Sequence, residues 1–119
     1  MFLLSENPIH LQNMDEPVRD EFFLELADLL THVWKKFGFY LNIDDKILGQ
    51  IDNDNAEIME KARACLYNWY EGTSNPCEEH LIWVAEKIQM QQVVMFIQSK
   101  FPHVGAGVDP ENASQPNCK

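Results

Sequence analysis

The sequence has few cysteines, few basic residues and no long hydrophobic run, and each shortage excludes a class of protein. Its 119 residues include three cysteines, an odd and sparse set that does not suit a disulfide framework. The longest apolar stretches, such as residues 93–97, are far shorter than the roughly 20 residues of a membrane-spanning helix. We therefore expect a single globular domain in the reducing cytoplasm, with free cysteines and no insertion into a membrane.

The scarcity of basic residues limits the partners that the chain can bind. Nine lysines and arginines stand against 19 acidic residues, which gives a net charge of -10. Nucleic-acid binding needs many basic groups to replace the counterions of phosphate, so we expect no nucleic-acid partner. The acids are concentrated in residues 15–28 and 44–60, with Lys35 and Lys36 between the two blocks. These blocks are either two solvated helix faces or a surface that attracts a basic partner.

Hydrophobic residues recur at spacings of three and four through residues 15–102, which is typical of amphipathic helices. No segment alternates with the period of two that indicates a strand. The fold class is therefore predicted to be all-α, with five or six short helices. We expect residues 1–14 to be a flexible N-terminal arm and residues 103–119 a flexible C-terminal tail. The residues predicted to be buried are Trp34, Leu66, Trp69, Leu81, Val84 and Ile97.

Side chains that cap helices predict where three of these helices begin. Asp44 precedes a short helix, and Asp54 with Glu57 fits a capping box ahead of the next. Asn75 is followed by Pro76, a residue favoured at the first position of a helix. These signals divide the second half of the chain into separate helices.

The order of these segments resembles the death domain, a six-helix antiparallel bundle. The resemblance covers residues 15–102 and depends on three segments: WKKFG at 34–38 followed by LNI at 41–43, ARACLYNW at 62–69, and LIWVAEKI at 81–88. Most of these are core residues, so they identify the fold better than the subtype. The caspase-recruitment domain and the death-effector domain are built on the same bundle and remain alternatives.

The resemblance implies a non-enzymatic module that acts through homotypic contacts between death domains. Its function would be that of an adaptor or regulator in apoptotic or inflammatory signalling. The partners it implies are other death-domain proteins, and the acidic charge favours one with a basic surface over self-association, which stays open. The interface candidates carried over from matching positions are Lys35, Lys36, Asp44, Asp45, Asp52 and Asp54.

Two aromatic residues are further interface candidates because of their positions on their helices. Trp83 projects away from the apolar stripe of its own helix, and Tyr67 lies about 140° from the centre of its stripe. Tryptophan and tyrosine often anchor interfaces. The alternative is that each ring packs on a neighbouring helix, which we favour for Tyr67.

A competing hypothesis is a small helical-bundle enzyme or metal-binding regulator that uses Cys77 and His80. A thiol at a helix N-terminus has a lowered pKa, and a histidine three residues later is a possible base. No third group orients this pair, and no second cysteine stands at Cys-x-x-Cys spacing. We therefore expect no catalytic residue, no metal site and no cofactor.

Overall fold

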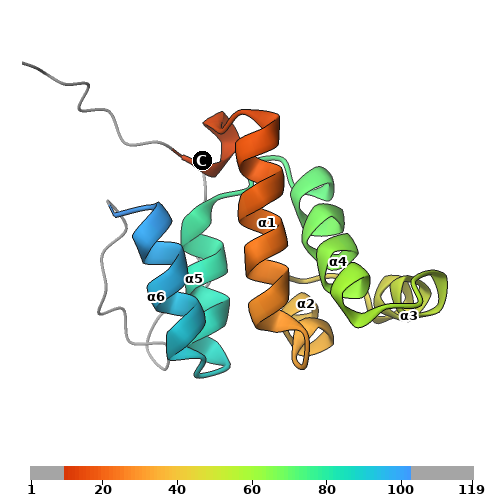
Figure 1. Ribbon diagram of the computed structural model, residues 1–119. Coiled ribbons are helices and arrows are strands. Elements are labelled where there is room, and N and C mark those ends of the chain that lie inside the picture. Colours follow the sequence, from red (N-terminus) through yellow and green to blue (C-terminus); the bar gives the residue numbers. More distant parts are fainter. Residues whose placement is uncertain (1–9, 103–119) are drawn as a thin grey trace, which may run out of the picture.

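The computed structural model describes residues 10–102, and the regular structure within this range is entirely helical (Figure 1). A short 3-10 helix precedes six α-helices: η1 (Leu11–Asn13), α1 (Glu16–Leu30), α2 (Trp34–Tyr40), α3 (Asp45–Asp54), α4 (Ile58–Gly72), α5 (Glu78–Lys87) and α6 (Gln91–Lys100). This confirms the predicted all-α class, with six helices in residues 10–102. None of these helices is long and apolar enough to cross a membrane.

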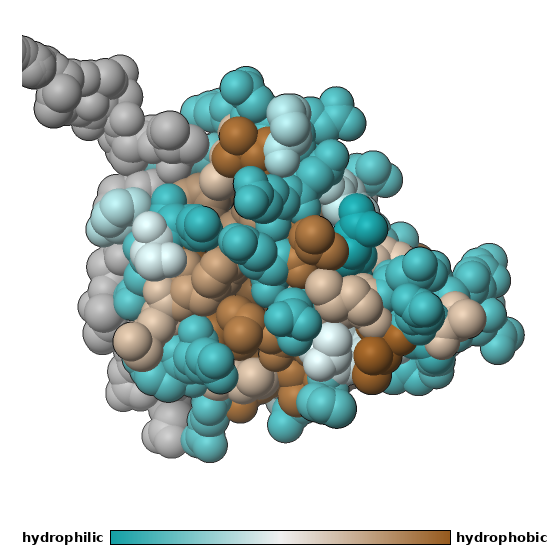
Figure 2. Space-filling view, in the orientation of Figure 1, coloured by the Kyte–Doolittle hydropathy of each residue, from teal (hydrophilic) through white to brown (hydrophobic). Residues whose placement is uncertain are grey.

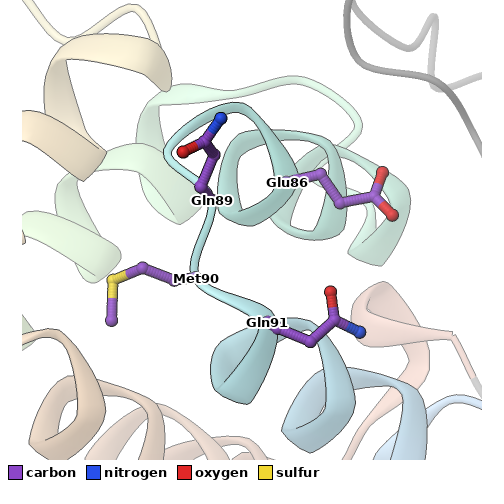
Figure 3. A pocket seen from close by; sticks show the side chains of 4 residues that line it. All are labelled: Glu86, Gln89, Met90 and Gln91. Carbon is purple, nitrogen blue, oxygen red and sulfur yellow. The ribbon is translucent and has the colours of Figure 1, made fainter.

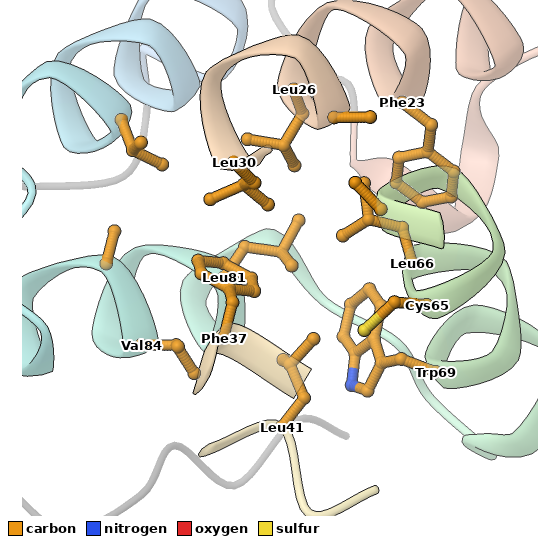
Figure 4. Packing of buried hydrophobic residues seen from close by; sticks show 14 of the residues in the cluster. Phe23, Leu26, Leu30, Phe37, Leu41, Cys65, Leu66, Trp69, Leu81 and Val84 are labelled. Atoms are coloured by element: carbon orange, nitrogen blue, oxygen red, sulfur yellow. The ribbon is translucent and has the colours of Figure 1, made fainter. Parts of the chain in front are cut away.

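The six helices surround one hydrophobic core. All six residues predicted to be buried are at most 6 % exposed. Figure 4 shows side chains of α1, α4 and α5 meeting in the centre, with Phe37 and Leu41 closing the core from the α2 side. Aromatic rings extend the core toward α6, because Phe22 stacks on Phe96 with ring centroids 5.6 Å apart.

The helix start predicted from Asp44 is correct, and a proline marks the start of α1. Pro17 lies in the first turn of α1, where its missing N–H costs no helical hydrogen bond. Asp44 precedes α3, and its side chain accepts a hydrogen bond from the backbone N–H of Lys46 at 3.3 Å. This bond satisfies one of the free N–H groups at the start of the helix.

The two other predicted caps are wrong. Asp54 is the last residue of α3, and α4 begins three residues beyond Asn55 without a side-chain cap. The amide of Asn55 donates instead to the carbonyl of Ile51 at 2.9 Å, so this segment closes α3 rather than opening α4. At the next boundary Asn75 and Pro76 precede the helix, which begins at Glu78.

The segment before α1 packs against the bundle from residue 10 onward. Leu11 is fully buried, and its backbone N–H donates to the carboxylate of Glu78 at 2.9 Å. Nδ1 of His10 lies 2.7 Å from the second oxygen of the same carboxylate. The packed chain therefore begins earlier than the boundary we placed at residue 15. The rest of the expected N-terminal arm and the expected tail at 103–119 lie outside the described residues.

Gly38 allows α2 to approach its neighbours closely. A Cβ atom at this position would lie 2.6 Å from Sγ of Cys65 on α4 and 2.7 Å from a methyl carbon of Leu48 on α3. Both residues are buried, so neither can move aside freely. The close packing of α2, α3 and α4 therefore depends on the absence of a side chain here.

Candidate interaction surface

Two of the predicted interface residues, Lys35 and Asp52, form an ion pair within the bundle. Nζ of Lys35 lies 3.1 Å from Oδ2 of Asp52, and Nζ of Lys61 lies 2.5 Å from Oδ1. The hydrogen bonds from Lys61 and Lys35 hold the pKa of Asp52 below its ordinary value. This carboxylate therefore joins α2, α3 and α4 at a partly exposed position, and much of its charge is compensated locally.

The other charged candidates are exposed, and three of them lie at the ends of α3. Asp44 and Asp45 stand at its start, where negative charge is favourable because of the helix dipole. Asp54 stands in its last turn, where the same dipole opposes it and no basic residue of α3 offsets it. Lys36 is exposed on α2. Figure 2 shows mostly hydrophilic residues over the end of the molecule where α3 lies.

Tyr67 packs against α1, as we favoured from the sequence. Its hydroxyl donates a hydrogen bond to Asp20, and its ring meets the ring of Phe23 edge to face with centroids 5.0 Å apart. The contacts of the Tyr67 side chain are therefore made within the bundle, on α1.

Trp83 is partly buried and packs against the hydrophobic core. Nζ of Lys87 lies 5.7 Å from the centroid of its ring, within range of a cation–π interaction. Its indole Nε1 is buried and has no hydrogen-bond partner among residues 10–102. Burial of much of its ring within the chain reduces the area that it could offer to a partner.

The Cys77 and His80 pair does not provide a free thiol beside a base. Cys77 is disulfide-bonded, so our expectation of free cysteines is wrong at this position. The imidazole of His80 is buried between two indoles, with ring centroids 5.7 Å from Trp69 and 6.2 Å from Trp83. Burial also raises the pKa of the Cys65 thiol to about 12, which keeps it protonated. Within residues 10–102 no three histidine, cysteine or acidic side chains are grouped to hold a metal ion.

The burial of His80 predicts a loss of stability in mild acid. Desolvation lowers its pKa below 6.5, so the unfolded chain takes up a proton at a higher pH than the folded one. The contribution of the neutral, buried His80 to the free energy of unfolding is complete above pH 6.5 and declines as the pH falls below 6.5. When the pH is lowered from 7.5 to 5, the free energy of unfolding measured with urea should therefore decline less in His80→Phe than in the wild type. The exposed His32, replaced by glutamine, is the control; an identical decline in all three proteins would contradict the prediction.

Among the depressions on the surface of residues 10–102 are two with a volume of about 270 Å³ each. One lies at the α5–α6 junction and is lined by Glu86, Gln89, Met90 and Gln91. In Figure 3 Glu86 and Gln91 extend to one side of the chain and the other two side chains to the opposite side. Partial burial raises the pKa of Glu86, and its Oε1 is buried without a hydrogen-bond partner among residues 10–102.

The second depression is a groove between the α2–α3 link, the start of α3 and the end of α4. Its walls include Asp44, Ile47, Asn68 and Trp69. Of these four residues, only Asp44 was predicted from the sequence to be an interface residue. The other three residues could not be identified from the sequence. Trp69 lies on an apolar stripe, which is typical of a core residue, and the groove joins segments that are more than 20 residues apart in the sequence.

Comparison of the chain with protein-family models, with curated proteins and with solved structures found no match in any of the three.

Proposed function

We propose that this chain is a non-enzymatic protein–protein interaction module of the death-domain type. It would act as a cytoplasmic adaptor or regulator in apoptotic or inflammatory signalling. Two features support the proposal: the six successive helices around one core, and the death-domain-like segments that contribute residues such as Trp34, Trp69 and Leu81 to that core. The caspase-recruitment and death-effector subtypes share this architecture and remain alternatives.

The observation that carries the proposal is the exposed acidic charge at both ends of α3. Asp54 lies where the helix dipole disfavours it, so its position is not explained by the stability of α3. Asp44 and Asp45 add two exposed carboxylates at the other end. A concentration of acids of this kind attracts a basic surface and repels a second acidic one. We therefore propose a death-domain partner with a basic interaction surface.

The proposal predicts selective, salt-sensitive binding. The full chain should form complexes with basic death-domain modules and not with acidic ones in a panel tested by analytical ultracentrifugation. Raising the salt from about 50 mM to about 300 mM should weaken these complexes, because screening shortens the range of the charges. Asp54→Asn should weaken binding further, while Asp28→Asn on α1 is the matched control.

Absence of binding to every basic module, or binding that is indifferent to salt and to Asp54→Asn, would contradict the proposal. Species heavier than the 13.8 kDa monomer in sedimentation runs of the chain alone would point to self-association, the alternative to a basic partner.

A further inference from the structure

The groove beside α3 has two walls of different chemistry. Asn42, Asp44 and Ile47 line it from the α2–α3 link and the first turn of α3, and Asn68, Trp69 and Thr73 line it from the end of α4. Asn42 holds its backbone at a φ of 69°, in the left-handed region, where the chain turns from α2 into α3. This turn leads the chain from α2 to the wall of the groove at the start of α3.

The α4 wall carries the negative end of a helix dipole. The last carbonyl groups of a helix have no partner within the helix, and the aligned peptide dipoles place a partial negative charge there. The last turn of α4 contains no basic residue, and the chain leaves it at Thr73 in an extended conformation. Across the groove stands the exposed carboxylate of Asp44, which has room for donors besides the N–H of Lys46. Together these groups favour a cationic side chain.

Trp69, which lines the groove, carries a buried hydrogen-bond donor without a partner among residues 10–102. Trp69 is 3 % exposed, and its indole Nε1 has no acceptor among residues 10–102. In Figure 4 this nitrogen points to the side on which Leu41 lies, and Leu41 also lines the groove. A buried donor without an acceptor costs about 1–3 kcal/mol, so an acceptor that reached it would be favoured.

An apolar contact completes the site. Ile47 is 38 % exposed and lines the groove together with Ile43, which is almost buried. An apolar side chain placed on Ile47 would cover surface that is now in water.

We propose that this groove binds an extended segment of a partner protein that carries a lysine or arginine next to an apolar residue. The cationic group lies between Asp44 and the carbonyl end of α4, the apolar side chain covers Ile47, and a backbone carbonyl of the segment accepts the N–H of Trp69. This inference rests on the proposed function, because it names the chemistry of the partner's contact.

Nuclear magnetic resonance of the full, 15N-labelled chain tests the site directly, because the indole N–H of Trp69 gives a signal of its own. The probe is a capped peptide with the sequence Gly-Leu-Arg-Leu-Lys-Gly, and its control carries glutamate in place of arginine and lysine. We expect the basic peptide to shift the Trp69 indole signal together with the backbone signals of Ile47 and Thr73. The acidic peptide should leave them unchanged.

Variants of residues that line the groove distinguish a loss of peptide binding from a loss of folding. Asp44→Asn keeps a good helix cap but removes the charge, and it should weaken peptide binding about tenfold, as expected for a hydrogen bond to a charged group. Ile47→Ala should weaken binding without unfolding the chain, since its side chain is partly exposed. Asp28→Asn, on the outer face of α1, is the control and should bind like the wild type.

The result that overturns the proposal is an unchanged Trp69 signal at saturating concentrations of the basic peptide, or equal binding of the acidic one. If the groove fails this test while basic death-domain modules still bind, the proposed function stands and the contact lies elsewhere. If the peptide binds the groove and no module binds, the groove remains a peptide site and the proposed function is wrong.

Discussion

Replacing Gly38 with alanine is expected to lower the free energy of unfolding by about 1–3 kcal/mol, as for other overpacked cores. The new methyl group would lie 2.6 Å from Sγ of Cys65 and 2.7 Å from a methyl carbon of Leu48. Relief of these contacts requires α2 to move away from α3 and α4. Urea unfolding measures the loss directly, because a change of midpoint at constant slope reports stability.

Gly49 provides a matched control, for which we expect alanine to raise rather than lower the free energy of unfolding. It lies in the interior of α3, is exposed, and a Cβ atom there would meet no atom within 4 Å. Gly49→Ala should therefore stabilise the protein by about 0.5–1 kcal/mol, the ordinary preference of a helix for alanine over glycine. Equal effects of the two substitutions would show that α2 is not packed as closely as the structure has it.

Replacing Glu78 with alanine is expected to release the N-terminal segment and to destabilise the protein by about 1–3 kcal/mol. The substitution removes the acceptor of the Leu11 N–H, and Leu11 is fully buried. It also removes the partner that lies 2.7 Å from His10. Hydrogen exchange should show faster exchange at Leu11 and in η1 than in the centre of α4.

The neighbouring Glu79 is the control for this prediction, since it carries the same side chain but is exposed. Glu79→Ala should leave both the stability and the exchange of η1 near their wild-type values. Glu78→Gln should be milder than Glu78→Ala, because its amide oxygen can still accept the Leu11 N–H. Slow exchange at Leu11 in Glu78→Ala would contradict this role of the carboxylate.

The core could be predicted from the sequence because helical periodicity is a local signal. Residues such as Leu66 and Leu81 recur with their apolar neighbours at spacings of three and four, and such a stripe must be buried. The cap at Asp44 was equally local, since it involves an N–H only two residues away. These parts of the fold needed no knowledge of distant segments.

The failures involve contacts that join distant parts of the chain. Glu78 fits the third position of a capped helix, yet its carboxylate binds residues 67 and 68 positions earlier. The disulfide bond of Cys77 was likewise not predicted from the local sequence. The capping box at Asp54 was plausible locally, but the bond from Asn55 to Ile51 extended α3 through it. Local propensity is a weak guide where packing and side-chain hydrogen bonds compete.

In the candidate interaction surface, too, local features could be predicted from the sequence and contacts between distant segments could not. The sequence located the exposed acids at the ends of α3, because charge blocks are visible without a structure. The sequence did not show that Lys35 and Asp52 bind each other, or that the indole N–H of Trp69 has no acceptor among residues 10–102. Both facts depend on how α2, α3 and α4 pack together.

The most direct test of the central claim is the rate of association with a basic death-domain module that binds in the panel. Stopped-flow measurements would compare the wild type with a double variant, Asp44→Asn and Asp45→Asn, at about 50 mM and about 300 mM salt. We expect the double variant to associate more slowly and with a weaker dependence on salt, while its unfolding midpoint stays close to that of the wild type, because asparagine also caps helices well. Equal association rates and equal salt dependence in the two proteins would contradict the claim that the acidic ends of α3 recruit the partner.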